Sequence, residues 1–174
     1  MIHNLAGIIT HMDKFVRLKS PKPILDSEIC KCVDRPPIVL QSHLTYNPIS
    51  CADCNLEVRL SQLDFTPDLI DKIADWRNFH DSFYHLWLDS SEYEDWAKEQ
   101  LSSAESPVNK RGLIIKDKIA ANIKCFFWWF VDNSDSNSKP ITKCPNCSSD
   151  LTKRENKFNV DTNICVHCSI IIAT

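Results

Sequence analysis

Apolar side chains in the middle of the chain recur at alternating steps of four and three residues, which is the period of an α-helix. The run starts after Thr66, a good N-cap residue that a proline follows at the first helical position. Its members are Leu69, Ile73, Trp76, His80, Phe83 and Trp87. Two further helices are expected, because Ser91 and Glu94 form a capping-box pattern and Ser106 is followed by Pro107, which is another helix-start pattern.

Short apolar or alternating segments on either side of this helical region predict β-strands. Before it they are residues 37–41, 44–46 and 55–60, and near the end of the chain they are residues 157–160 and 169–173. Helices and strands are therefore segregated along the chain, and this order favours an α+β protein.

The run Cys125–Val131, with the sequence CFFWWFV, is too short and too aromatic for another helix and predicts a strand. Phe126, Trp128 and Phe130 would point to one face, and Phe127 and Trp129 to the other. Apolar residues on both faces favour a core strand that is covered on both sides, with Trp76, Trp87 and Trp96 of the helices as natural partners. The alternative is an open platform on which nucleic-acid bases stack, but only Lys124 supplies an adjoining positive charge.

The first 19 residues carry an apolar stripe that is typical of a short amphipathic element: Leu5, Ile8, Ile9, Met12 and Val16. Asp13 and Lys14 stand where a signal peptide needs apolar residues or a small-residue cleavage site. No apolar run reaches the roughly 18 residues that a membrane span requires. We therefore expect a cytoplasmic protein without a membrane segment, in which thiols are kept reduced.

Eight of the nine cysteines form two sets of four, and their spacing predicts two metal sites. The first set is Cys30, Cys32, Cys51 and Cys54, and the second is Cys144, Cys147, Cys165 and Cys168. Two residues between cysteines let one tight turn aim both sulfurs at one ion, and a hairpin brings the two turns together. Four thiolates leave no coordination position for water, so the predicted ligand is structural Zn²⁺, two ions per chain.

The residues after three of the cysteine pairs depart from the usual pattern, in which a glycine often follows. Asn55 adopts a left-handed backbone fairly cheaply, whereas Ser148 and Ser169 do so less readily. Cys125, the ninth cysteine, is expected to be a core thiol beside the aromatic residues.

Nothing in the sequence indicates an enzyme, because it lacks an evident nucleophile–base pair, an open metal site and a glycine-rich phosphate loop. His80 and His85 are five residues apart and therefore lie on different faces of their helix. His167 lies inside the last cysteine pair, where it would replace a cysteine only by straining the turn.

Charge is unevenly distributed, and two clusters suggest different partners. Residues 66–105 carry a net charge of −7 and residues 106–174 carry +4, against −3 for the whole chain. The acidic side chains predicted to bind a basic protein partner are Asp89, Glu92, Glu94, Asp95 and Glu99. The basic side chains that would instead bind nucleic acid are Lys143, Lys153, Arg154 and Lys157.

The segment FYHLWLDSSEYEDWAKEQLSSAESPVNKRGL, the aromatic strand and the pairs CPNC and CVHC together resemble an uncharacterised bacterial family. Members of this family contain a zinc ribbon and are described as nucleic-acid binding. The resemblance covers residues 83–168 and implies zinc ligation by Cys144, Cys147, Cys165 and Cys168.

These patterns together predict an α+β protein in which two four-cysteine zinc ribbons flank a three-helix middle, with an aromatic core strand. The expected segments are residues 1–65 with the first ribbon, 66–122 with the helices, and 123–174 with the aromatic strand and the second ribbon. We expect a non-enzymatic, zinc-stabilised protein-binding module, such as an adaptor subunit or an inhibitor or immunity protein of a toxin or nuclease. The alternative is a nucleic-acid-binding zinc-ribbon protein.

Overall fold

The computed structural model describes residues 13–33, 36–42, 44–134, 140–157 and 160–174. Four members of the expected N-terminal stripe, residues 5 to 12, lie outside these ranges. Its last member, Val16, is exposed and begins the short 3₁₀ helix η1 (Val16–Leu18). A second 3₁₀ helix, η2 (Asp26–Glu28), precedes the first cysteine set.

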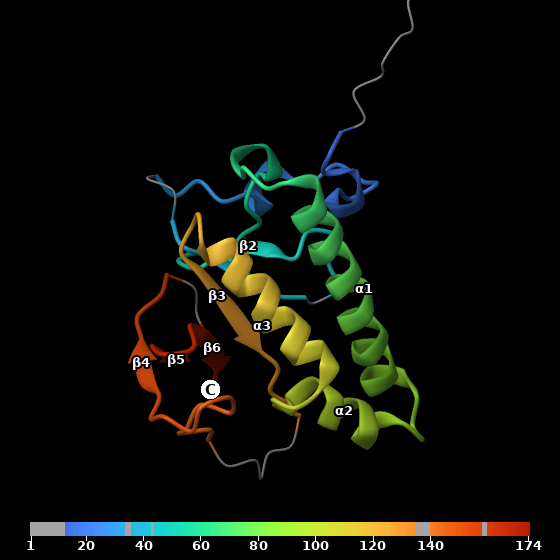
Figure 1. Ribbon diagram of the computed structural model, residues 1–174, viewed down its shortest axis with the longest axis vertical. Helices are drawn as coiled ribbons and strands as arrows, with labels where there is room; N and C mark the ends of the chain where they lie inside the picture. The colour runs from blue at the N-terminus through green and yellow to red at the C-terminus, as the bar shows by residue number, and fades with distance from the viewer. Residues whose placement is uncertain (1–12, 34–35, 43, 135–139, 158–159) are drawn as a thin grey trace, which may run out of the picture.

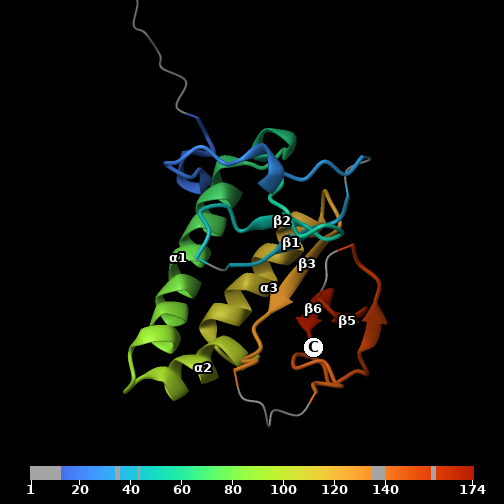
Figure 2. The same cartoon turned by 180° about the vertical axis from the view of Figure 1, so that it is seen from behind.

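The fold is mixed α+β and contains one six-stranded sheet in the order β2-β1-β3-β6-β5-β4. The strands are β1 (Ile38–Leu40), β2 (Ile49–Cys51), β3 (Cys125–Trp129), β4 (Thr152–Arg154), β5 (Thr162–Cys165) and β6 (Ile170–Ala173). Three neighbouring strands, β1, β3 and β6, run parallel, while the β1–β2, β4–β5 and β5–β6 pairs are antiparallel. Both cysteine-bearing segments therefore contribute strands to the same sheet, with the aromatic strand β3 between them (Figures 1 and 2).

The helices pack beside the sheet, with α3 nearest β3 and the long α1 on the far side of α3 (Figure 1). Their bounds are α1 (Pro67–Asp89), α2 (Glu94–Ser102) and α3 (Pro107–Ala120). The predicted N-caps of α1 and α3 are confirmed, because the hydroxyls of Thr66 and Ser106 accept backbone N–H bonds three residues on. At α2 only half of the capping box forms. Ser91 donates its backbone N–H to Glu94 but lies outside the helix at φ 58°.

The aromatic strand is a core strand, as its alternation predicts. Phe127 and Trp129 are 1% exposed and face the helices, where the Phe127 ring lies 5.7 Å from the ring of Trp76. Phe126, on the other face, is also buried and packs with the sheet residues Val39, Ala52 and Ile171. Trp96 was expected to cover this strand, but it is half exposed and contacts Phe83 instead.

The second face of β3 is covered because the sheet curls until the turn after β2 contacts the end of β4. Asp53 follows β2 at one end of the strand order, and Arg154 ends β4 at the other. Nevertheless, the Arg154 guanidinium lies 3.4 Å from the Asp53 carboxylate, and the Lys157 backbone N–H donates to the Asp53 carbonyl at 2.9 Å. This curvature encloses a small second core on the inner face.

Two of the predicted strands differ from the observed elements. Residues 44–46 are not a strand, because Leu44 takes a left-handed backbone at φ 60°; β2 begins only after Pro48. Residues 55–60 form single bridges through Glu57 and then enter the 3₁₀ helix η3 (Leu60–Gln62). Of residues 157–160, two lie outside the described ranges. The predicted strand at 169–173 is confirmed as β6.

Within the described ranges, no helix combines the length and the apolar character needed to cross a bilayer.

Candidate functional site

Two four-cysteine groups are brought together, and they are the two sets that the spacing predicts. The first contains Cys30, Cys32, Cys51 and Cys54, and the second contains Cys144, Cys147, Cys165 and Cys168. Within each group the sulfur atoms all lie within 4.8 Å of one another. Zinc–sulfur bonds of about 2.3 Å place the four sulfurs of a tetrahedral site about 3.8 Å apart. Both groups therefore have the donors and the spacing to hold a metal ion.

Two of the cysteine turns share one hydrogen-bond pattern. The Cys51 backbone N–H donates to the Leu56 carbonyl at 2.8 Å, and the Cys51 carbonyl accepts from the Asn55 N–H at 2.9 Å. In the second group, Cys144 makes the equivalent bonds with Ser149 and Ser148, both at 2.8 Å. Equal spacing thus produces the same closed turn at both sites.

The residues after the cysteine pairs adopt the left-handed backbone that glycine usually supplies. Asn55, Ser148 and Ser169 have φ values of 58°, 60° and 53°. The absence of glycine therefore does not change the shape of these turns, although each serine accepts a backbone conformation that is costly for a residue with a Cβ.

N–H groups near the cysteines donate to the sulfur atoms. The backbone N–H groups of Cys32, Asp53 and Cys168 each lie 3.4 Å from a cysteine sulfur. The side-chain amide of Asn146 donates to Cys168 Sγ at 3.2 Å. Such bonds spread the negative charge of thiolates, so these turns suit sulfur in the form that binds metal.

The pKa values of the thiols fit a site that needs a cation. Burial raises the pKa of Cys51 to about 11 and that of Cys144 to about 12. By contrast, hydrogen bonds from Ser149 lower the pKa of the exposed Cys147 to about 6. At these pKa values the thiols of Cys51 and Cys144 keep their protons at neutral pH, so a bound cation would supply the charge that ionises them.

The second group is linked to the helices by a buried lysine. The Lys116 ammonium group, on α3, donates to the Cys168 carbonyl at 3.1 Å and pairs with Asp117 at 2.5 Å. In the first group, the Cys30 N–H donates to the Glu57 carbonyl at 2.8 Å, and this bond links the segment before β1 to the segment after β2. Each cysteine group therefore joins segments that are distant in sequence.

The remaining candidates from the sequence lie outside these groups. Cys125 is buried, and burial raises the pKa of its thiol to about 12, so it behaves as the predicted core thiol. His167 is exposed and does not belong to the second group. His80 is buried against Trp76 and Tyr84, whereas His85 is exposed, as their different helix faces predict.

The acidic side chains singled out by charge lie together where α1 ends and α2 begins. Asp89, Glu92, Glu94, Asp95 and Glu99 are all exposed. Among the described residues, none of their carboxylates lies within ion-pair distance of a lysine or arginine. Three large apolar side chains of the same segment, Leu88, Tyr93 and Trp96, are exposed by 44%, 55% and 49%. We call these eight residues the acidic corner. Sequence reasoning found its charges but missed its apolar members.

The basic cluster is arranged differently, because carboxylates of the same chain already pair with three of its four members. Lys143 pairs with Asp150 at 2.8 Å and Lys153 with Asp161 at 3.2 Å. Arg154 is mostly buried in its contact with Asp53.

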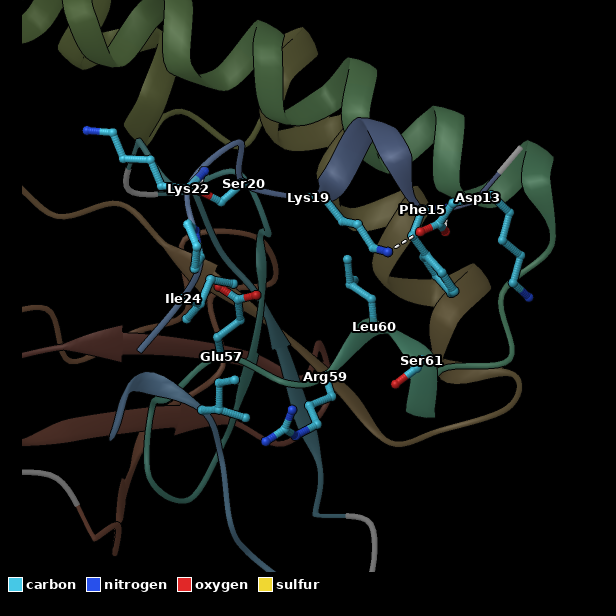
Figure 3. A pocket seen from close by; sticks show the side chains of 13 residues that line it. Asp13, Phe15, Lys19, Ser20, Lys22, Ile24, Glu57, Arg59, Leu60 and Ser61 are labelled. Carbon is cyan, nitrogen blue, oxygen red and sulfur yellow. Dashed lines mark hydrogen bonds and ion pairs between the residues drawn. The ribbon is translucent and has the colours of Figure 1, made fainter. Parts of the chain in front are cut away.

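A separate pocket of about 550 Å³ opens near η1 and η3 (Figure 3). Its floor is largely apolar and includes Phe15, Ile24 and Leu60. Lys19 and Asp13 pair at its rim, and burial raises the pKa of Glu57. No histidine or cysteine occurs among its described lining residues.

Comparisons of the chain with models of protein families, with curated proteins and with solved structures each found no match. The resemblance to a bacterial zinc-ribbon family therefore stays a prediction, and function is inferred from the chain's own residues.

Proposed function

We propose that this protein is a non-enzymatic protein-binding module that two structural zinc ions stabilise, acting as an adaptor subunit or as an inhibitor of another protein. Zinc is the metal that tetrahedral four-thiolate sites most often hold, and four protein ligands leave no position for a reacting water. The ions would fix the cysteine turns on either side of β3 and would supply no catalytic chemistry.

The zinc ions would stabilise a fold whose hairpins are short. Strands β1, β2 and β4 contain three residues each. Hairpins of this length are marginal on their own. Structural zinc contributes on the order of 10 kcal/mol to small modules. In this account, the metal ions add stability at both ends of a sheet whose outer strands are short.

The acidic corner is the observation that carries the binding proposal. Its carboxylates are exposed and make no ion pair with a lysine or arginine in the described part of the chain, and three exposed apolar side chains lie among them. Aromatic anchors inside a charged rim are typical of protein interfaces. The complementary partner surface is basic and carries an apolar patch, for example an amphipathic helix rich in lysine and arginine.

Nucleic acid is the second candidate, and the ion pairs of the basic cluster count against it. Phosphate binding depends on positive charges that are available to displace counterions. Lys143 and Lys153 already have carboxylate partners, and Arg154 is largely buried. Three of the four positive charges that would bind phosphate groups are therefore already paired with carboxylates of this chain.

Charge reversal separates a protein partner from nucleic acid. One variant carries Glu92→Lys, Asp95→Lys and Glu99→Lys. Its matched control carries Lys143→Glu, Lys153→Glu and Lys157→Glu, and changes the net charge by the same amount in the opposite direction. Each protein is immobilised and exposed to extract from its own cells at physiological salt. Captured proteins are identified, purified and titrated by calorimetry, and DNA and RNA are tested by mobility shift.

The expected result is a basic protein that binds the wild type and the control variant but is lost by the acidic-corner variant. Added salt should then act mainly on the association rate. Micromolar binding of DNA or RNA that disappears in the control variant would contradict the proposal and favour the nucleic-acid alternative. Equal capture by all three proteins would identify the acidic corner as plain solvated surface.

A further inference from the structure

A small cavity lies beyond the carboxyl ends of the parallel strands β1 and β3. Its volume is about 80 Å³, and its lining residues are Ser42, His80, Tyr84, Trp87, Trp128, Phe130 and Val131. Ser42 follows β1, while Phe130 and Val131 follow β3; His80, Tyr84 and Trp87 come from α1. Open parallel sheets commonly bind ligands just outside the carboxyl ends of their strands. The aromatic run therefore lines a cavity where a ligand could bind, in addition to its place in the core.

The aromatic walls meet nearly at right angles. The ring planes of Trp87 and Phe130 are inclined by 81°, those of Tyr84 and Phe130 by 89°, and those of Tyr84 and Trp87 by 66°. The three centroid separations are 4.9, 6.2 and 5.2 Å respectively. Each of these pairs is an edge-to-face contact at the cavity, and Trp128 lines the same cavity. The negative faces of such rings attract a cation placed between them.

Charge around the cavity also favours a cation. No lysine or arginine occurs among its described lining residues. Asp81 lies behind the wall, where its carboxylate accepts a hydrogen bond from the Ser42 hydroxyl and lies 3.9 Å from His80 Nδ1. Burial works to raise the pKa of Asp81, but His80 and Ser42 together hold it below its usual value, so the group is ionised at neutral pH. The Asp81 carboxylate, on which Arg77 also acts, thus supplies a negative charge behind Ser42 and His80 of the cavity wall.

The size of the cavity limits what enters it. Water occupies about 30 Å³ per molecule in the liquid, so 80 Å³ corresponds to between two and three waters. Whole-ligand sites typically measure about 300–1,000 Å³. The cavity therefore accepts one compact head group, not a nucleobase or a complete cofactor.

We propose that Tyr84, Trp87, Trp128 and Phe130 form an aromatic cage that binds a methylated ammonium group, with Asp81 supplying the opposite charge. Recognition of such cations by perpendicular aromatic walls is a general use of cation–π attraction. The group belongs either to a free small molecule or to a methylated lysine side chain of another protein. This site is distinct from the acidic corner and does not depend on the partner proposed above.

Choline chloride and 3,3-dimethylbutan-1-ol test the cage, because the alcohol has the same shape without the charge. Each is titrated into the metal-loaded protein by calorimetry, and the tryptophan indole N–H signals are followed by NMR. Choline should bind and shift the signals of Trp87 and Trp128, while the alcohol should bind at least about tenfold more weakly. Equal binding of both probes, or no binding of choline at tens of millimolar, would overturn the proposal.

Variants identify the residues responsible. Trp87→Leu should weaken choline binding roughly 2- to 30-fold, and Trp87→Phe should weaken it less. Asp81→Asn, which keeps an acceptor for Ser42, should weaken choline binding without changing the affinity for the alcohol. Trp96→Leu, at an exposed tryptophan outside the cavity, is the matched control and should change neither. Thermal unfolding of each variant shows whether it is folded, and a folded Trp87→Leu with unchanged choline affinity would contradict the cage.

A short peptide that contains trimethyllysine distinguishes the two sources of the head group. Binding at least about tenfold tighter than that of choline would indicate a methylated protein, because backbone contacts would add to the cage. Affinity equal to or below that of choline would indicate a free small molecule. Failure of both probes would overturn the cage and leave the acidic-corner proposal untouched, since that depends on other residues.

Discussion

Gly112 allows α3 to approach the aromatic strand, and its replacement by alanine should destabilise the protein. A Cβ atom at this position would lie 2.3 Å from Cε2 of Phe127 and 2.8 Å from Nε1 of Trp76. Favourable contacts between carbon atoms begin at about 3.5 Å, so the first distance is too short by more than 1 Å. The helix and the strand are therefore too close for any side chain between them.

Neither ring has room to move away. Phe127 is 1% exposed and lies between Trp76 and Trp129, with ring centroids 5.7 and 6.0 Å away. The Trp76 indole N–H donates to the Val108 carbonyl at 3.0 Å, which fixes that ring in turn. Overpacking of this kind typically costs about 1–3 kcal/mol, and here the upper part of that range is expected.

Helix propensity acts in the opposite direction, because alanine favours a helix interior by about 1 kcal/mol over glycine. The net result for Gly112→Ala should be a loss of about 1–2 kcal/mol in the free energy of unfolding. Urea unfolding of the metal-loaded protein measures it, provided that the slope against urea concentration is unchanged.

A double-mutant cycle identifies the cause of the loss. Phe127→Leu removes the ring atoms that the new methyl group would meet, so Gly112→Ala should cost at least about 1 kcal/mol less in that background. If Gly112→Ala leaves the wild type equally stable or stabilises it, the reasoning about this contact is wrong.

Two further predictions concern β3 and the segment that follows it. Trp129→Ala should lower the free energy of unfolding, measured in urea, by about 3–5 kcal/mol, and Trp128→Ala, at a half-buried side chain, should lower it clearly less. Equal losses for the two variants would contradict the assignment of their faces. Burial acts to raise the pKa of Asp132, but hydrogen bonds, chiefly from Lys98, lower it to about 2. A lowered pKa contributes stability that is complete above about pH 5 and is lost as the pH falls through 4 toward 2. Asp132→Asn should therefore cost about 1–2 kcal/mol at pH 7, and a wild-type carboxyl that titrates above pH 3 by NMR would contradict this.

Local signals in the sequence predicted the helices well. Thr66 and Ser106 each combine a capping hydroxyl with a following proline, and both caps form as expected. Such signals depend on residues within one turn of each other, so they can be read without knowledge of the fold.

The sheet could not be predicted in the same way, because its pairings join distant segments. Nothing local indicates that β1 lies parallel to β3, or that β6 lies on the other side of β3. The β2 strand was placed too early, since Leu44 turns the chain with a left-handed backbone and the Asn47 side chain bonds to the Ile49 N–H. These features depend on tertiary packing.

The two four-cysteine groups were predicted completely from the sequence, whereas only the charges of the proposed acidic corner were predicted. Cysteine spacing determines which sulfurs can converge, and both groups converge as expected. The exposure of Trp96 could not be predicted from the helical pattern. The pattern shows which side chains share a helix face, but not which other elements pack against that face. The aromatic cavity was missed for the same reason, since it joins α1 with the ends of two strands.

The number of zinc ions per chain tests the central claim most directly, because the account depends on two structural metal centres. Native mass spectrometry and elemental analysis of protein purified under reducing conditions should give two zinc ions. Cys54→Ser and Cys147→Ser should each lose one ion, while Cys125→Ala, at the cysteine outside both groups, should keep two. Zero or one zinc ion in the wild type, or two ions retained by either serine variant with unchanged heat stability, would contradict it.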